Sequence, residues 1–105
     1  MIPYGRQDVT QADIDSVVAV LRSEFLTQGP AVPRFEDAVA ALVGARHAIA
    51  VNSGTSALHI ACLALGLGTG EWLWTTPNTF VASANCGRYC GANVDSSTSI
   101  RRRGT

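Results

Sequence analysis

Residues 50–58 read AVNSGTSAL, and this stretch decides the fold because an apolar segment runs through a turn of small residues into a helix. Gly54 lets the backbone approach an anion closely, and the hydroxyls of Ser53, Thr55 and Ser56 can donate hydrogen bonds. The first amides of the helix point the same way, with the helix dipole behind them. The stretch therefore indicates a phosphate site, while a plain helix cap explains it equally well when it is taken alone.

The upstream residues predict two helices separated by a loop. Thr10 can cap a helix over residues 11–23, in which apolar residues recur at helical spacing. A second apolar face begins at Phe35, and Gly44 is placed to end that helix in the left-handed conformation. Between them, residues 26–33 contain one glycine and two prolines, so we expect an extended loop there.

The downstream residues predict alternating strands and helices. A short apolar, β-prone run places a strand at residues 47–51, and further strands are expected at residues 71–75 and from Ala92 onward. The intervening stretches, residues 56–65 and 79–89, are predicted to be helices. Strand, helix, strand, helix, strand is typical of an α/β fold with a parallel sheet and crossover helices.

Two further motifs flank the central turn and give it a family context. Residues 26–30 read LTQGP upstream, followed by Phe35-Glu36, and residues 75–85 read TTPNTFVASAN downstream. In this order and spacing, the chain from Ile2 to about Val94 resembles the N-terminal part of the DegT/DnrJ/EryC1/StrS sugar aminotransferases. The resemblance implies the N-terminal part of the large domain of a fold type I pyridoxal phosphate enzyme.

The resemblance also implies a cofactor site. Gly54, Thr55 and Ser56 would hold the phosphate of pyridoxal 5'-phosphate, and Phe80 would stack on its pyridine ring. Without the family context, Phe80 would more often be a core residue, and the three turn residues would only cap a helix.

The substrate implied by the resemblance is a UDP-linked 4-keto-6-deoxy amino sugar, aminated in nucleotide-sugar biosynthesis of the pseudaminic acid type. Tyr4, Thr27 and Gln28 are the candidates for contacts with this nucleotide-sugar, because such ligands need hydrogen-bonding groups and aromatic surface on loops. Exposed polar residues of a loop usually only solvate a turn, and this is the alternative for Thr27 and Gln28. The family resemblance further implies an amino donor such as glutamate and a homodimer.

The chain contains no lysine, because all eight of its basic residues are arginine. Enzymes of this family bind the cofactor aldehyde as a Schiff base on a lysine amine. We therefore assign no catalytic residue to this chain and expect it to be inactive alone. A non-catalytic remnant or a small phosphate-binding module is the alternative.

The last ten residues differ from the body of the chain. Through Asp95 there are five arginines against eight acidic residues, a net charge of −3, and Arg101, Arg102 and Arg103 return the total to zero. One permitted codon choice for residues 95–101 is GAT TCG TCG ACA TCG ATC CGC, and one T inserted after GAT makes it encode DFVDIDP, a continuation usual in the family. We expect residues 1–95 to be the aminotransferase segment and residues 96–105 to be an out-of-frame translation; a disordered tail is the alternative.

Composition sets the remaining expectations. Zero net charge argues against nucleic-acid and membrane partners, and no signal peptide or membrane-length apolar run is visible, so we expect a cytoplasmic protein.

Three cysteines, at positions 62, 86 and 90, are expected to be buried reduced thiols and not a metal site. His59 is expected to be half-buried and structural, and Trp72 and Trp74 to pack between sheet and helix.

Overall fold

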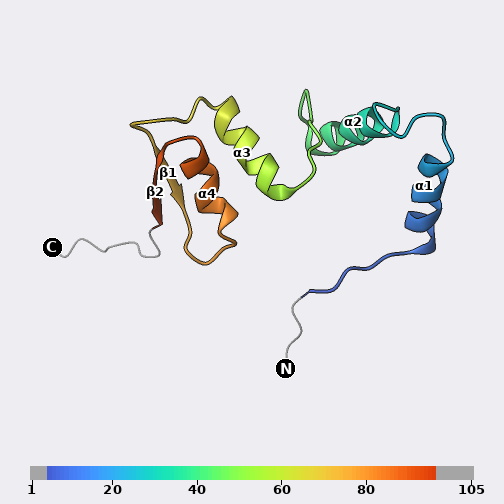
Figure 1. Cartoon of the computed structure of the whole chain (residues 1–105), viewed down its shortest axis with the longest axis horizontal. Helices are drawn as coiled ribbons and strands as arrows, with labels where there is room; N and C mark the ends of the chain where they lie inside the picture. The colour runs from blue at the N-terminus through green and yellow to red at the C-terminus, as the bar shows by residue number, and fades with distance from the viewer. Residues whose placement is uncertain (1–4, 97–105) are drawn as a thin grey trace. The chain divides into compact units, whose positions relative to one another are not determined.

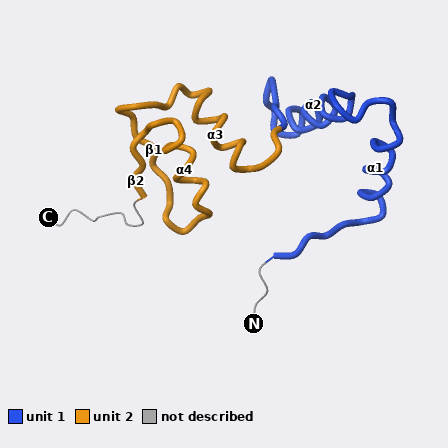
Figure 2. The backbone as a smooth tube through the Cα atoms, in the orientation of Figure 1, with its two compact units in different colours: residues 1–50 blue, residues 51–105 orange. Residues whose placement is uncertain are grey.

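The computed structural model describes residues 5–96, which belong to two compact units, 1–50 and 51–105. Figure 1 labels the helices and strands, and Figure 2 colours the two units separately. None of the helices in the described range is long and apolar enough to cross a membrane.

The first unit begins with helix α1, Gln11–Leu21, which carries the predicted cap. The Thr10 backbone N–H and hydroxyl donate to Asp13 Oδ2 at 2.7 and 2.8 Å, and the Asp13 N–H donates back to Thr10 Oγ1 at 3.4 Å. This reciprocal pairing satisfies N–H groups that a helix N-terminus leaves without partners. The prediction of a capped helix from residue 11 is confirmed.

Helix α2, Ala31–Val43, begins earlier than the sequence predicted. The expected loop over residues 26–33 is wrong in its last three residues, because Pro33 lies inside the first helical turn. A proline is tolerated there, since the N–H that it lacks would have had no partner within the helix. Gly44 ends the helix with φ 70°, as predicted.

The predicted strand at residues 47–51 is wrong, since these residues form no strand. The Ala50 N–H donates instead to Glu36 Oε1 at 2.8 Å, so a side chain of α2 takes the position that a neighbouring strand would occupy. A strand requires a partner for its backbone groups, and the described part of the chain supplies none here.

The second unit contains α3 (Gly54–Ala64), β1 (Trp72–Thr75), α4 (Ala82–Tyr89) and β2 (Asn93–Ser96). The two strands pair in parallel, with Trp72 opposite Asn93 and Thr75 opposite Ser96, and α4 connects them. The predicted strand–helix–strand unit and the parallel sheet are confirmed. Two helix starts differ from expectation, since α3 begins two residues earlier and α4 three residues later.

The buried core of the described residues lies in this second unit. Its members are Cys62, Ala82, Cys86 and Ala92, each at most 7% exposed. Gly87 marks a close approach of α4 to the sheet, since a β-carbon there would lie 2.9 Å from Leu73 Cδ2 and 3.1 Å from Val94 Cγ2. A glycine is therefore needed where the helix crosses the strands.

The two tryptophans of β1 share one face, as predicted, but the expected sheet-to-helix packing is wrong. Trp72 and Trp74 are 59% and 69% exposed, whereas Leu73 between them is half-buried next to Gly87 of α4. Successive side chains of a strand point to opposite faces, so α4 covers the face of Leu73 and leaves the tryptophan face open.

Candidate functional site

The candidate site is the N-terminus of α3 and the turn that leads into it. Ser53 caps the helix, because its side-chain oxygen accepts the Ser56 N–H at 3.2 Å and its carbonyl accepts the Ala57 N–H at 3.0 Å. Within the described residues, the N–H groups of Gly54 and Thr55 donate to no protein acceptor. These two amides remain available to an anion at the positive end of the helix dipole.

The serine hydroxyls of the turn bond to one another and to Asn52. Ser56 Oγ donates to Asn52 Oδ1 at 2.7 Å, and Ser53 Oγ lies within donating distance of Ser56 Oγ, at 3.0 Å. Ser53 Oγ is also 3.4 Å from Asn52 Oδ1. Among the hydroxyls predicted to bind phosphate, only that of Thr55 has no hydrogen-bond partner in the described part of the chain.

An open hollow of about 520 Å³ joins the turn to the segment before α4. It is lined by Gly54, Thr55, Ala57, Leu58, Phe80, Ala82 and Ser83. Three of the four predicted cofactor residues therefore meet at one surface, and the fourth, Ser56, is adjacent in the same helical turn but does not line it. The volume lies in the range usual for small-molecule sites, and the lining contains no acidic side chain.

Phe80 lies before the first turn of α4, outside the helix in which the sequence placed it. The Phe80 carbonyl accepts the Ser83 N–H at 3.1 Å, and Thr79 Oγ1 lies 3.1 Å from Ser83 Oγ. These two local hydrogen bonds stabilise the turn before α4. The ring is 74% exposed and lines the hollow, so it is no core residue within the described structure. An exposed aromatic ring beside free amides can cover the flat face of a ligand.

The predicted substrate residues belong to the first unit or lie outside the described range. Thr27 and Gln28 are exposed in the turn between α1 and α2, and Gln28 has φ 53°, an uncommon conformation for a residue other than glycine. Tyr4 lies outside the described residues. The structure therefore places the two loop residues at a solvent-facing turn.

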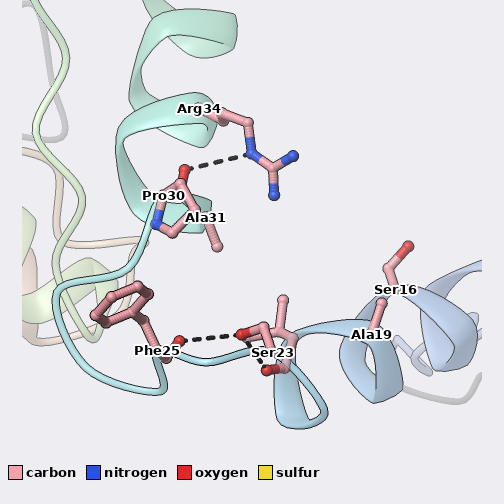
Figure 3. A pocket seen from close by; sticks show the side chains of 8 residues that line it. Ser16, Ala19, Ser23, Phe25, Pro30, Ala31 and Arg34 are labelled. Atoms are coloured by element: carbon pink, nitrogen blue, oxygen red, sulfur yellow. Dashed lines mark hydrogen bonds between the residues drawn. The ribbon is translucent and has the colours of Figure 1, made fainter.

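A separate hollow of about 310 Å³ lies in the first unit (Figure 3). It is lined by Ser16, Ala19, Val20, Ser23, Phe25, Pro30, Ala31 and Arg34. The Ser23 hydroxyl donates to the carbonyls of Val20 and Phe25 at 2.7 and 3.2 Å, and Arg34 Nε donates to the Pro30 carbonyl at 3.3 Å. The Ser23 hydroxyl and Arg34 Nε of this hollow therefore stabilise the turn between α1 and α2. Thr27 and Gln28 do not line the hollow.

His59 is half-buried as predicted, and the expectation of buried cysteines holds for Cys62 and Cys86 but is wrong for Cys90. Cys62 and Cys86 are buried, Cys90 is half-buried, and all three are free thiols. Burial, followed by hydrogen bonding to Cys86, raises the pKa of Cys62 to about 11, so this thiol stays protonated and unreactive near neutral pH. His59 is half-buried, with its ring edge-on to Tyr89 at 5.3 Å. In the described range, no group of three or more His, Cys, Asp or Glu residues is arranged to hold a metal ion.

Sequence reasoning missed Asn52 and Ser83. Asn52 precedes Ser56 by four residues and Ser83 follows Thr79 by four, but both bonds form across a helix start, so they depend on where each helix begins. The sequence has no clear signal for the late start of α4, because the N-cap residue, Val81, has no side chain that could form a capping hydrogen bond.

Comparison with known proteins decides the family. Residues 7–96 match the sequence profile of the DegT/DnrJ/EryC1/StrS aminotransferase family. The chain belongs to this family. Over 95 residues it is 44% identical to the UDP-4-amino-4,6-dideoxy-N-acetyl-beta-L-altrosamine transaminase of Campylobacter jejuni subsp. jejuni serotype O:23/36 (strain 81-176), covering 90% of this chain and 25% of that enzyme. It is 43% identical over 91 residues to the spore coat polysaccharide biosynthesis protein SpsC of Bacillus subtilis (strain 168), covering 87% and 23% of the two chains.

Solved structures of aminotransferases have the same fold. The aminotransferase from Psychrobacter cryohalolentis superposes with a TM-score of 0.80 at 34% identity, over 90% of this chain and 25% of that one. Spr1654 from Streptococcus pneumoniae in its PLP form superposes with a TM-score of 0.84 at 28% identity, over 98% and 26%. The cofactor of the family is pyridoxal 5'-phosphate, and this chain spans about a quarter of the length of its relatives.

Proposed function

We propose that this chain forms the cofactor-phosphate site of a sugar aminotransferase that uses pyridoxal 5'-phosphate. The observation that carries the proposal is the hollow in which the free amides of Gly54 and Thr55 meet the exposed ring of Phe80. Two backbone N–H groups and one hydroxyl suit a phosphate dianion, and no carboxylate lines the hollow to repel it. The residues present therefore fit the phosphate end of the cofactor.

Each residue of the site has a separate role in this proposal. Gly54 and Thr55 bind the phosphate through their amides, and the Thr55 hydroxyl adds a third donor. Phe80 covers the ring of the cofactor and excludes water from that face. When bound, the cofactor supplies the electron sink that transamination requires. Since the chain has no lysine, these residues bind and orient the cofactor without forming a covalent bond to it, and we expect no turnover from this chain alone.

For the substrate, we propose a UDP-linked 4-keto-6-deoxy amino sugar, with an amino donor such as glutamate. The support is the name of the C. jejuni transaminase, which is 44% identical to this chain. Thr27, Gln28 and Tyr4 are our candidates for contacts with the nucleotide-sugar: Thr27 and Gln28 are polar residues exposed on a loop, and Tyr4 offers an aromatic ring with a hydroxyl. A homodimer of the complete enzyme also belongs to this proposal.

The proposal is tested by calorimetric titration of the 105-residue chain with pyridoxamine 5'-phosphate and with pyridoxamine. Neither ligand has an aldehyde, so neither needs a lysine to bind. We expect the phosphorylated ligand to bind more tightly, and Thr55→Val to reduce that preference by about tenfold or more, the usual effect of losing a hydrogen bond to a charged group. Equal affinity of the unchanged chain for the two ligands would contradict the proposal.

We also propose that the aminotransferase sequence ends at Asp95 because of a shift of reading frame. The family match ends at residue 96, which supports a break at this point. Ser96 still pairs with Thr75 in β2, and residues 97–105 lie outside the described range. Resequencing the gene from the codon of Val94 tests the proposal: an additional base that restores DFVDIDP supports it, and the same sequence read again excludes it.

A further inference from the structure

The hydrogen bonds around Asn52 decide which groups of the α3 N-terminus can meet an anion. Asn52 Oδ1 accepts the Ser56 hydroxyl at 2.7 Å, the shortest of the bonds in this turn. Ser53 Oγ accepts the Ser56 N–H at 3.2 Å and lies 3.0 Å from Ser56 Oγ. Each serine hydroxyl has a single proton, and both protons are directed to acceptors inside the turn.

An acceptor such as phosphate needs donors, so a hydroxyl whose proton is already donated offers it only lone pairs. The Ser56 side chain is therefore closed to the anion as long as Asn52 holds its proton. The Thr55 hydroxyl has no such partner in the described part of the chain, and Thr55 lines the hollow whereas Ser56 does not. Two adjacent hydroxyl residues thus differ in what they can bind.

We infer that Asn52 is a positioning residue that withholds the Ser56 hydroxyl from the cofactor phosphate, so that within this turn only Gly54 and Thr55 bind the phosphate. This inference rests on the proposed function, because it concerns the same phosphate. It assigns Ser56 a structural role in the turn, in place of the phosphate-binding role that the sequence suggested. It also makes Asn52 the residue that determines how many hydroxyls reach the ligand.

The test is a double-mutant cycle on the full 105-residue chain. Ser56→Ala is measured in the unchanged chain and in the Asn52→Ala background, with Thr55→Val as the matched control. The readout is the ratio of affinities for pyridoxamine 5'-phosphate and pyridoxamine, measured by calorimetry. A change in folding alone moves both affinities together and leaves this ratio unchanged, so the ratio separates positioning from a structural effect.

We expect Ser56→Ala to change the ratio by less than about twofold when Asn52 is present, whereas Thr55→Val lowers it about tenfold or more. In the Asn52→Ala background the Ser56 hydroxyl is released to the ligand, so Ser56→Ala should then lower the ratio severalfold.

Two results overturn the inference while the proposed function survives. One is a tenfold loss on Ser56→Ala with Asn52 present, which would make Ser56 a ligand. The other is no effect of Ser56→Ala in either background, which would mean that Asn52 withholds nothing. If the unchanged chain binds both ligands equally, the proposed function fails and this inference fails with it.

Discussion

The two units of this chain form their helices by different means. In the first, neither α1 nor α2 has a buried residue, and order comes from local bonds such as those between Thr10 and Asp13 and the left-handed Gly44. In the second, α3 and α4 contribute Cys62, Ala82 and Cys86 to a small core beside the parallel strands. Local capping can define where a helix begins, but burial of apolar surface supplies most of the stability of a fold.

This difference predicts that the two units open independently and with unequal free energies. Amides of α4 and β1 should exchange with solvent more slowly than those of α1 and α2, because their hydrogen bonds lie beside the buried residues. Single substitutions in either unit should separate the two contributions.

Gly87→Val should destabilise the second unit most strongly. A β-carbon at this position would lie 2.9 and 3.0 Å from the Leu73 side chain and 3.1 Å from Val94, so the substitution forces α4 away from the sheet. Overpacking of this kind costs about 1–3 kcal/mol. Hydrogen exchange followed by NMR should show faster exchange across α4 and β1, with α1 and α2 unchanged.

Gly68→Val is the matched control, because a β-carbon at Gly68 meets only ordinary contacts at 3.9 Å. An equal loss of protection in the two variants would mean that the close packing at Gly87 does not hold the second unit together.

Raising the pH should weaken the second unit through Cys62. Its pKa is raised from 9.0 to about 11, mainly by burial, so the folded unit retains a proton that the unfolded chain loses. The stability from this thiol is therefore complete below pH 9 and is lost as the pH rises toward 11. Urea unfolding followed by circular dichroism should show this loss, and Cys62→Ala should remove most of the pH dependence. A pH dependence unchanged in Cys62→Ala would assign it to other groups.

Thr10→Ala should have a smaller effect, confined to the first unit. It removes the side-chain oxygen that accepts the Asp13 N–H and one of the donors to Asp13, and loss of an N-cap typically lowers a helix population about fivefold. NMR chemical shifts of α1 should move toward coil values, while those of α4 stay in place. Ser16→Ala, which removes only a bond from Ser16 to the Ala12 carbonyl within α1, is the control. Equal shifts in both variants would argue against the cap.

The same α1 cap has a pH dependence of opposite sign to that of Cys62. Hydrogen bonds from the Thr10 backbone, and then from its side chain, lower the pKa of Asp13 below 3.8. The carboxylate form is the one that caps, so its contribution is present above pH 3.8 and is lost as the pH falls through the lower folded value. In Thr10→Ala, the acid-induced loss of α1 should begin at a higher pH.

Signals contained within a few residues were predictable from the sequence. The α1 cap and the left-handed Gly44 are examples, since each depends on nearby residues. The parallel strands were predicted instead from the alternation of strands and helices along the chain. The strand expected at residues 47–51 failed because a strand is defined by its partner, and the Ala50 amide bonds to Glu36 instead. Similarly, the last three residues of the predicted loop, residues 31–33, belong to helix α2, because a proline such as Pro33 is tolerated in a first helical turn.

The sequence named residues that line the hollow at the α3 N-terminus, but it did not predict the hydrogen bonds of the turn. Glycine and hydroxyl residues after an apolar run identified Gly54 and Thr55, and the structure places Phe80 with them at one hollow. The role of Asn52 could not be predicted, because Asn52 and Ser56 compete for several possible partners until the helix start is fixed. Which hydroxyl keeps a free proton is a property of the folded turn.

The exposed face of β1 also makes the two units separately observable. Both tryptophans of the chain, Trp72 and Trp74, lie on this strand, and the first unit has none. Intrinsic fluorescence excited at the indole band therefore originates only from the second unit, and solvent-exposed rings emit at long wavelength before any unfolding occurs. A melt followed by tryptophan fluorescence would report on the second unit alone, by intensity more than by wavelength, and would remain blind to α1 and α2.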